Sequence, residues 1–294
     1  MTILSLGSGK KQTVLISGSS TGIGEAAAKL LAEKGWTVFA GVRKQADADK
    51  LKSYHTNIHP VFLDVTKDDQ VKEAVEQVRV AVGEDGLDAL VNNAGYISSG
   101  PTEFIAIEDV QKQFDVNVVG FIRLTQAAMP LIRMGKPGRV INISSIAVEQ
   151  FAPFCGMYNG TKAAMEVITQ AFRQEVSRWG IHVILIRPGP VATNFMPTMF
   201  SIHSDYMKRF APGTPCHDLY GKHLEHLPKT ADAFKNMFVQ PKIVAERIYE
   251  ALTAKNPKRL YYDTWGSFFT IQMIRWMPAS WYDASIERLM FVKD

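Results

Sequence analysis

Residues 13–24 read Thr-Val-Leu-Ile-Ser-Gly-Ser-Ser-Thr-Gly-Ile-Gly. The apolar, partly β-branched run from Thr13 to Ser17 predicts a strand, and a helical pattern from Glu25 to Lys34 follows the glycines. A strand, a glycine-rich turn and a helix in this order are typical of the opening of a dinucleotide-binding βαβ unit. A tight loop without a ligand is the alternative, which the position between strand and helix disfavours.

The glycines indicate what this turn would bind. They let the backbone turn sharply and approach a pyrophosphate, and the free N–H groups at the start of the helix face its negative charge. The spacing is G-x-x-x-G-x-G and not the more general G-x-G-x-x-G. We therefore predict cofactor contacts from six residues of the turn: Gly18, Ser20, Thr21, Gly22, Ile23 and Gly24.

The end of the second predicted strand bears on the choice of nucleotide. This strand covers Trp36 to Val42 and is followed by Arg43. In such units an acidic residue at this point accepts hydrogen bonds from the adenosine ribose, whereas a cation suits a 2′-phosphate. We therefore predict NADP(H) in preference to NAD(H), with Arg43 on the 2′-phosphate. An ordinary surface arginine is the alternative, because Thr21 leaves the other basic position of the turn uncharged.

Strands and helices go on alternating along the chain. Strands are predicted over 61–63, 89–91, 139–143, 183–186 and 259–262, with helices over 68–82, 108–134, 158–179 and 241–253. The alternation predicts an α/β fold, a single Rossmann-type doubly wound parallel sheet with helices on both faces. We assign this catalytic domain to residues 12–264, between a flexible arm at 1–11 and an aromatic-rich extension at 265–294.

Small and polar residues follow several of these strands, at the carboxyl ends where such sheets bind ligands. Asp64 and Val65 are placed to reach the adenine. Asn92 contacts the cofactor or ties the backbone, and both roles stay open. The prolines of residues 187–193 stiffen a loop whose Thr193 hydroxyl is free to hold a carboxamide. The predicted contacts of this group are Asp64, Val65, Asn92, Ala94, Gly95, Pro188, Gly189, Val191 and Thr193.

Tyr158 and Lys162 stand four residues apart at the head of a helical pattern, and therefore share one helix face. A cation near a phenol favours the phenolate and lowers its pKa toward neutrality, which suits a proton donor in alcohol–ketone interconversion. Taken alone, the pair is more often a solvated helix face. Both residues are also predicted to contact the cofactor.

Two further polar residues are candidates for the same crevice. Ser145 follows the fifth predicted strand and is placed to hydrogen-bond the substrate oxygen beside the phenol. Asn117 lies in the middle of an apolar helix face, where a buried amide is costly without partners. Either a structural hydrogen bond satisfies it, or the helix opens locally there to hold a water.

Two aromatic-rich segments break the alternation. Residues 194–238 mix Met, Phe and Tyr with polar residues without clean periodicity, which favours a lid over an apolar substrate; ordinary packing helices are the alternative. A single helix is expected over 267–291. It covers the substrate pocket or a dimer partner, or it contacts a membrane surface.

Composition narrows the class of protein. The chain of 294 residues carries a net charge of +4 without a long basic run, which gives no nucleic-acid footprint. Its two cysteines form no CxxC, and no His or Cys has a metal-ligand spacing, so no metal is expected. No segment reaches the roughly 20 apolar residues of a membrane span, and the first eleven residues are too short for a signal peptide. We expect a cytoplasmic protein, with membrane association left open.

Read together, these motifs resemble those of the short-chain dehydrogenase/reductase family. They are the glycine turn, Asn92-Asn93-Ala94-Gly95, Asn117, Ser145, Tyr158-x-x-x-Lys162 and Pro188-Gly189, which occur in family order over residues 11–262. One departure is Ser17, where the family usually has Thr; the hydroxyl is kept. The long 194–238 segment, the aromatic tail and residues 38–43 look most like the steroid and retinol dehydrogenase branch.

The resemblance implies a seven-stranded parallel sheet with strand order 3-2-1-4-5-6-7, and a catalytic tetrad. Tyr158 would be the general acid and base, and Ser145 would orient the carbonyl. Lys162 would lower the tyrosine pKa and hold the nicotinamide ribose, while Asn117 would anchor a water that relays protons. Family members commonly form dimers or tetramers through the helices that correspond to 108–134 and 156–179.

The resulting hypothesis is an NADP(H)-dependent oxidoreductase that moves hydride between nicotinamide and a hydrophobic, steroid-like or retinoid-like secondary alcohol or ketone. A reductase of smaller carbonyl compounds is one alternative. A cofactor-binding sensor or scaffold without turnover is another, against which the intact tetrad argues.

Overall fold

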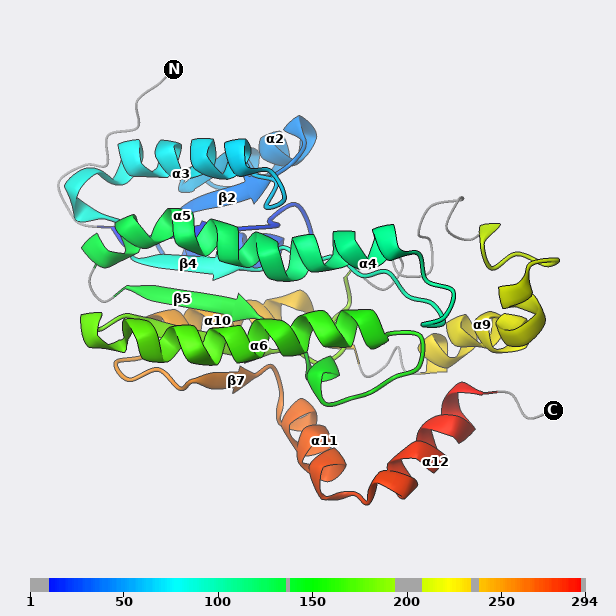
Figure 1. Ribbon diagram of the computed structural model, residues 1–294. Coiled ribbons are helices and arrows are strands. Elements are labelled where there is room, and N and C mark those ends of the chain that lie inside the picture. Colours follow the sequence, from blue (N-terminus) through cyan, green and yellow to red (C-terminus); the bar gives the residue numbers. More distant parts are fainter. Residues whose placement is uncertain (1–10, 136–137, 194–207, 234–237, 292–294) are drawn as a thin grey trace.

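The structure, a computed structural model, describes residues 11–135, 138–193, 208–233 and 238–291. Seven strands form one sheet in the order β3-β2-β1-β4-β5-β6-β7, with every neighbouring pair parallel (Figure 1). The strands are β1 Thr13–Ile16, β2 Thr37–Val42, β3 Ile58–Phe62, β4 Ala89–Asn92, β5 Arg139–Ile143, β6 His182–Arg187 and β7 Leu260–Tyr262. The predicted fold and strand order are confirmed.

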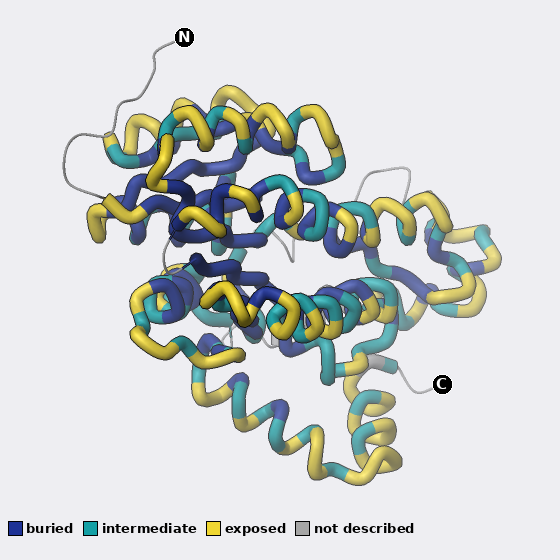
Figure 2. Tube along the Cα trace, turned by 60° about the vertical axis from the view of Figure 1, so that its left-hand side comes forward, coloured by how far each residue is buried: buried dark blue, intermediate teal, exposed yellow. Residues whose placement is uncertain are grey.

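Helices cover both faces of the sheet. Helices α1 (Gly22–Glu33), α2 (Gln45–Tyr54) and α10 (Pro241–Thr253) pack on one face, and α3 (Asp68–Val82), α5 (Gly120–Met134) and α6 (Gly156–Val176) cover the other. Strands β1, β2, β4 and β5 are buried along their whole length, as parallel strands covered on both sides require. Figure 2 shows these strands as the buried interior and the outer helix faces as exposed.

Most element bounds agree with the sequence to within a few residues, and those of α3, β5 and α10 agree throughout. Strand β3 begins at Ile58, earlier than predicted, and therefore contains Pro60. A proline cannot donate to a neighbouring strand, which makes it acceptable here because β3 is the edge strand of the sheet. Helix α2 was not predicted, because its residues are mostly polar and only Ala48 and Leu51 are buried.

The helix predicted over 108–134 is interrupted in its middle. Helix α4 (Ile107–Phe114) passes through a π-helical turn at Asp115–Val119 into α5. In that turn the Gly120 N–H donates to the carbonyl oxygen of Asp115, five residues back. Such a turn inserts one extra residue into a helix and is frequent at functional sites.

The described parts of the two aromatic-rich segments form three helices. Residues 194–207 and 234–237 of the predicted lid lie outside the described residues, and its later part forms the helix α9, Pro215–Ala233. The single tail helix is wrong: α11 (Trp265–Trp276) ends before Met277-Pro278, and α12 (Ala279–Met290) begins after them. Pro278 stands at the N-cap of α12, where its fixed φ starts a new helix but cannot continue the old one.

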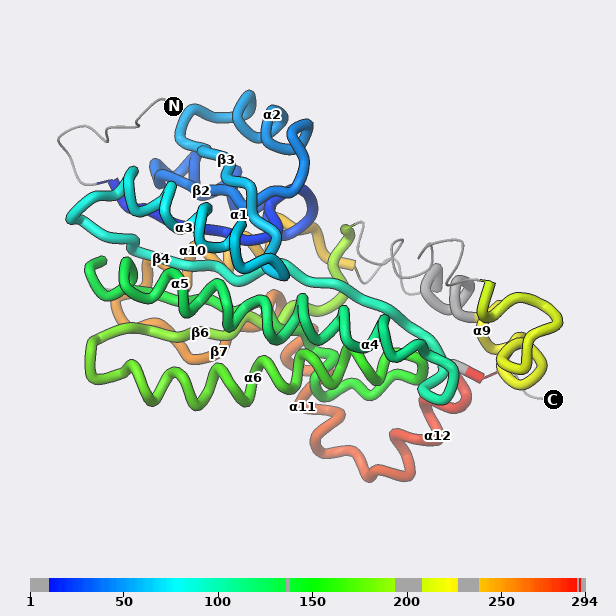
Figure 3. The backbone as a smooth tube through the Cα atoms, turned by 45° about the horizontal axis from the view of Figure 1, so that its top comes forward, coloured from blue at the N-terminus to red at the C-terminus, as the bar shows by residue number. Residues whose placement is uncertain are grey.

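The tail returns to the main body of the protein. Figures 1 and 3 show α11 and α12 as a V below the sheet, with the end of α12 near α9. There the Phe291 ring lies 4.8 Å from that of His223 on α9 and 5.9 Å from that of Phe154, before α6. The end of the tail therefore packs on α9 and on the segment that precedes α6.

Candidate active site

The glycine turn after β1 requires glycine at specific positions. Gly18 and Gly22 have φ of +68° and +63°, in the left-handed region where side chains are strained. Gly24 has no room for a side chain, because a Cβ would lie 2.3 Å from the Gly18 carbonyl oxygen. The turn thus brings bare backbone to the start of α1, whose N-cap residue Thr21 makes no side-chain capping hydrogen bond within the described structure. This fits a pyrophosphate held by the N–H groups of the first helical turn.

Asn93 holds this turn in shape, a role that the sequence analysis did not assign. Its Nδ2 donates to the carbonyl oxygens of Ser17, at 3.0 Å, and Gly18, at 2.9 Å. The Ser17 hydroxyl accepts from the backbone N–H groups of Asn93 and Ala94, at 3.1 and 3.0 Å. The end of β1 is therefore tied to the end of β4 on both sides, and Ser17 supplies the hydroxyl expected of a threonine.

The two residues predicted to lie beside the adenosine half of the cofactor, Arg43 and Asp64, follow neighbouring strands. Arg43 is exposed directly after β2, and Asp64 follows the neighbouring strand β3. Burial raises the pKa of Asp64, but hydrogen bonds from Thr66 and the charge of Arg43 leave it below the ordinary value. Val65 is buried, and its side chain packs against Gly120. The structure thus places an exposed cation and a carboxylate after the carboxyl ends of β2 and β3.

Asn92 serves the packing of the chain. It is 2% exposed, and its Nδ2 donates to Asn142 Oδ1 at 2.8 Å and Thr125 Oγ1 at 2.9 Å. Asn142 in turn donates to Thr169 on α6. The Nδ2 group thus supports the structural interpretation of Asn92, while its Oδ1 has no hydrogen-bond partner among the described residues. A cofactor contact of Asn92 stays a prediction.

The loop after β6 closes over the glycine turn. The Thr193 methyl group would lie 3.0 Å from a Cβ at Gly22, so the two segments are in contact. The Gly189 N–H donates to the buried Asp263 carboxylate at 2.9 Å, and the Pro188 carbonyl oxygen accepts from the Ile146 N–H. Asp263, directly after β7, is a second positioning residue that sequence reasoning missed, because nothing local links it to a loop 74 residues away.

The catalytic candidates meet at the carboxyl end of β5. Ser145 begins a short 3-10 turn, where its Oγ accepts from the Ala147 N–H at 3.1 Å, and it also hydrogen-bonds the Tyr158 phenol. Tyr158 is partly buried in the first turns of α6, one turn before Lys162. The structure thus brings the Ser145 hydroxyl to the Tyr158 phenol, while its contact with a substrate oxygen stays a prediction.

Lys162 is buried beneath this pair. Its Nζ donates to the Ile143 carbonyl oxygen at 2.8 Å and lies 5.8 Å from the centre of the Tyr158 ring. Burial lowers the pKa of Lys162 to about 8, against the opposing attraction of Glu166. A Cβ at Gly95 would lie 3.9 Å from Nζ and 3.7 Å from Asn117 Oδ1, so both side chains border the bare backbone of Gly95.

The pKa of Tyr158 departs from the sequence-based expectation. Burial raises it above the ordinary value, the hydrogen bond to Ser145 lowers it by less, and the nearby Cys155 thiol raises it. Burial therefore dominates this pKa in the chain by itself, and the lowering by Lys162 stays a prediction. The burial that brings the ammonium under the ring also removes water from the phenol, and Lys162 directs its hydrogen bond to Ile143 instead.

Asn117 shows features of both predicted roles, a structural hydrogen bond and a local opening of the helix. It is fully buried in the π-helical turn, so the helix is opened locally as one of them required. Its Oδ1 accepts from the Tyr96 N–H at 2.8 Å, and its Nδ2 donates to the Tyr96 carbonyl oxygen at 2.8 Å and Thr161 Oγ1 at 3.0 Å. The side chain thus binds the loop after β4 to α6, while the role of a water anchor stays a prediction.

A model of the short chain dehydrogenase family matches residues 12–201. The chain belongs to this family, as its motifs, its sheet and the grouping of its Ser, Tyr, Lys and Asn side chains indicated. A Streptomyces avermitilis short-chain dehydrogenase shares the fold, with a TM-score of 0.73 and 25% identity over 95% of this chain and 98% of its own.

Relatives of known activity place the chain more closely. An NADPH-dependent 3-dehydrocapnine reductase of Ornithobacterium rhinotracheale is 35% identical over 84% of this chain and 86% of its own. Bovine 17-beta-hydroxysteroid dehydrogenase type 6 is 31% identical over 94% and 87%, and human retinol dehydrogenase 5 is 31% identical over 93% and 85%. Within the family, the chain belongs to the steroid and retinol dehydrogenase branch, as the sequence analysis predicted.

Proposed function

We propose that the protein is an NADP(H)-dependent oxidoreductase acting on a hydrophobic secondary alcohol or its ketone. The observation that carries the proposal is the Ser145–Tyr158 hydrogen bond above the buried Lys162, at the carboxyl ends of the central strands. When bound, the nicotinamide supplies or accepts the hydride. The chain supplies binding, orientation and the proton.

Each member of the tetrad has a role in this reaction. Tyr158 holds the proton that passes to the carbonyl oxygen, and Ser145 donates a hydrogen bond to that oxygen and fixes its position. The Lys162 ammonium favours the ionised phenol and binds the ribose of the nicotinamide half. Asn117 keeps α4 and α5 open beside Lys162, where a water would connect the site to solvent.

The preference for NADP(H) is supported by the exposed Arg43 at the end of β2. An arginine is a good partner for a 2′-phosphate because its planar guanidinium offers paired donors. The similarity to an NADPH-dependent reductase supports the same preference. The remaining cofactor contacts are proposed at the glycine turn and after β3, β4 and β6, at the residues predicted from sequence.

An apolar substrate is supported by the surroundings of the site. Relatives named as hydroxysteroid and retinol dehydrogenases resemble the chain over nearly its whole length. Helix α9 contributes Tyr220, whose ring meets those of Phe104 and Phe154 edge-on at 6.0 Å each. These aromatic contacts join the described part of the predicted lid to the segments that follow β4 and β5.

The first experiment is a consumption assay. Purified protein receives NADPH or NADH together with a panel of steroid, retinoid and short aliphatic carbonyl compounds, and nicotinamide absorbance is followed. NADPH consumption with a bulky apolar carbonyl is the expected result. Consumption with short carbonyls alone would favour the small-substrate reductase, and NADPH binding without any turnover would favour the sensor or scaffold.

The tail and the central helices suggest two further associations. The described helices include none with the length and apolar character of a membrane span. Helix α11 nevertheless presents an exposed apolar face, and α12 adds an indole; the residues are Trp265, Phe269, Met273, Trp276 and Trp281. Such aromatic faces suit a membrane interface, whereas the contact of Phe291 with α9 favours a cover over the pocket. Liposome flotation with and without residues 265–294 separates the two.

A homodimer or homotetramer through α4, α5 and α6 is the other association. Ile107, Val119 and Val167 are exposed apolar residues on these helices or the π-helical turn between them, which suits a surface covered by a second copy. Light scattering after size-exclusion chromatography would determine the oligomeric state. A Val167→Glu variant that stays monomeric would locate the interface.

A further inference from the structure

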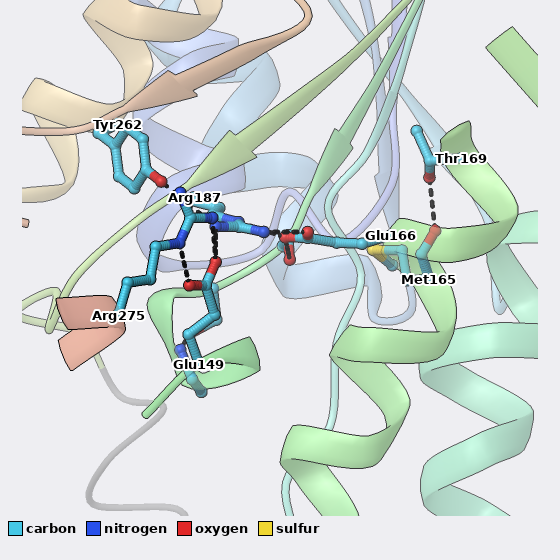
Figure 4. A network of polar contacts seen from close by, with 10 residues as sticks. Glu149, Met165, Glu166, Thr169, Arg187, Tyr262 and Arg275 are labelled. Atoms are coloured by element: carbon cyan, nitrogen blue, oxygen red, sulfur yellow. Dashed lines mark hydrogen bonds and ion pairs between the residues drawn. The ribbon is translucent and has the colours of Figure 1, made fainter. Parts of the chain in front are cut away.

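A buried arginine stands at the carboxyl end of β6. Arg187 is 8% exposed and pairs with Glu166 on α6: its Nε donates to Oε1 at 2.7 Å, and its Nη2 contacts Oε2 (Figure 4). Its Nη1 contacts Glu149, after β5, and donates to the Tyr262 hydroxyl at 3.2 Å. One guanidinium thus connects α6 with the ends of three neighbouring strands.

The Glu166 carboxylate is linked to two members of the tetrad, to Ser145 through its neighbour Ser144 and to Lys162 through a shared helix face. Its Oε1 accepts a hydrogen bond from the Ser144 hydroxyl at 2.6 Å, and Ser144 directly precedes Ser145. On α6, Glu166 follows Lys162 by four residues, so that both side chains lie on one helix face. Glu166 is itself 8% exposed, and is therefore held by Arg187 and Ser144 and little by water.

The charges around Lys162 make Glu166 its principal counter-charge. On α6 the titratable neighbours are Tyr158 and Glu166, and β6 contributes Arg187 beyond Glu166. Strand β5 offers the Ile143 carbonyl oxygen, and the π-helical turn offers the Asn117 amide, neither of which titrates. Burial lowers the pKa of Lys162 and Glu166 raises it, leaving it at about 8.

We propose that Glu166, held in place by Arg187, is a positioning residue that fixes the Ser145 strand end through Ser144 and serves as the counter-charge of Lys162. The inference rests on the proposed function, because the roles of Ser145 and Lys162 belong to it. A bidentate arginine fixes the plane of the carboxylate, so that its two oxygens keep their separate partners. Loss of Arg187 would leave the buried Glu166 carboxylate without this ion pair, whereas loss of Glu166 would leave Arg187 paired with Glu149 alone.

The test uses NADPH binding, which does not require a known substrate. NADPH affinity is measured by fluorescence across the pH range around the Lys162 pKa of about 8, together with the melting temperature. In Glu166→Gln, the pH above which affinity falls should move down by about one unit, because Lys162 loses its counter-charge. Arg187→Met should weaken NADPH binding. The double variant Arg187→Met/Glu166→Gln should lose less NADPH affinity than the sum of the losses in the two single variants.

Arg139→Met is the matched control. Arg139 is also a buried arginine of this sheet, but it begins its strand, and it donates to the Ala251 and Ala254 carbonyl oxygens at the opposite end of the strands. The Arg139→Met substitution should lower the melting temperature and leave the pH profile of NADPH affinity unchanged. An unshifted profile in Glu166→Gln, or an equal shift in Arg139→Met, would overturn the counter-charge role.

Ser144→Ala tests the hydrogen bond between Ser144 and Glu166, and it keeps the proposal testable if Glu166→Gln does not fold. The charges of Glu166 and Lys162 are kept, so the pH profile of NADPH binding should not change. Turnover should fall about tenfold, because Ser145 loses the support of its neighbour. Unchanged turnover would overturn this role. If the wild-type protein binds NADPH and turns over no carbonyl, the proposed function fails, and the shift in Glu166→Gln still decides the counter-charge.

Discussion

The Nζ atom of Lys162 lies 5.8 Å from the centre of the Tyr158 ring, while its hydrogen bond goes to the carbonyl oxygen of Ile143. The lysine is thus near enough to act on the phenol by its charge but is anchored to β5. Burial meanwhile raises the pKa of the phenol and lowers that of the ammonium. The chain holds the phenol in its protonated form, as a proton donor to a carbonyl requires.

Removal of the phenol hydroxyl should abolish the chemistry and keep the site. In Tyr158→Phe the ring still packs in α6, so NADPH binding should be kept, weakened by no more than about tenfold through the lost hydroxyl contact, while turnover should fall by about 10²–10⁴-fold. Steady-state kinetics and fluorescence titration measure the two effects. Tyr54→Phe is the control, since this exposed phenol binds Glu33 on the surface. Substantial turnover in Tyr158→Phe would remove Tyr158 from its role.

The buried charge of Lys162 should reduce the free energy of unfolding of the protein. Its pKa of about 8 lies below the ordinary lysine value of 10.5, so the folded state holds its proton less tightly than the unfolded state. Stability should therefore rise as the pH increases from about 8 toward 10.5. At neutral pH, Lys162→Met should gain about 1–3 kcal/mol, which would raise the melting temperature by a few degrees.

Melting curves at several pH values would measure this difference. The advantage of the methionine variant should shrink as the pH approaches the ordinary lysine pKa, because the wild-type lysine is then neutral in both states. A variant that melts below the wild-type protein at neutral pH would show that the Ile143 hydrogen bond outweighs the cost of the buried charge.

Asn93 should control cofactor affinity without touching the cofactor. Its amide holds the carbonyl oxygens of Ser17 and Gly18, which shape the turn before α1. Loss of two hydrogen bonds of about 0.5–1.5 kcal/mol each predicts a roughly tenfold weaker NADPH affinity for Asn93→Ala. Asn57→Ala is the control, because Asn57 also donates to a backbone carbonyl, that of Ala32, away from the turn. Equal effects of the two substitutions would contradict the assignment.

The sequence predicted the sheet and the grouping of the candidate site for one physical reason. In a parallel sheet the carboxyl ends of all strands face one edge, so that residues just after Ile16, Val42 and Ile143 must lie near one another once the strands are recognised. The apolar runs of these buried strands are strong signals. The break in the tail also had a local signal, since Pro278 lacks an N–H and disfavours the continuation of a helix through it, although α5 accommodates Pro130.

Other features depend on contacts that leave no local pattern. Glu166 and Arg187 are 21 residues apart and belong to different elements, so neither periodicity nor spacing pairs them. The π-helical turn at Asn117 arises because Tyr96 and Thr161 bind its amide from both sides. The raised pKa of Tyr158 follows from burial at the site, whereas the spacing to Lys162 shows only the nearby charge.

Arg43 should set the nucleotide preference. It is exposed directly after β2, with Asp64 nearby, and we propose that it binds a 2′-phosphate there. Arg43→Leu should weaken NADPH binding by about 10–100-fold, the value of one or two charge-assisted hydrogen bonds, and leave NADH binding nearly unchanged. Lys44→Met is the control, because it removes the adjacent exposed cation and the same unit of net charge. If both variants weaken NADPH binding equally, the effect is general electrostatic attraction; if Arg43→Leu weakens NADH as much as NADPH, Arg43 supports the turn and does not read the phosphate.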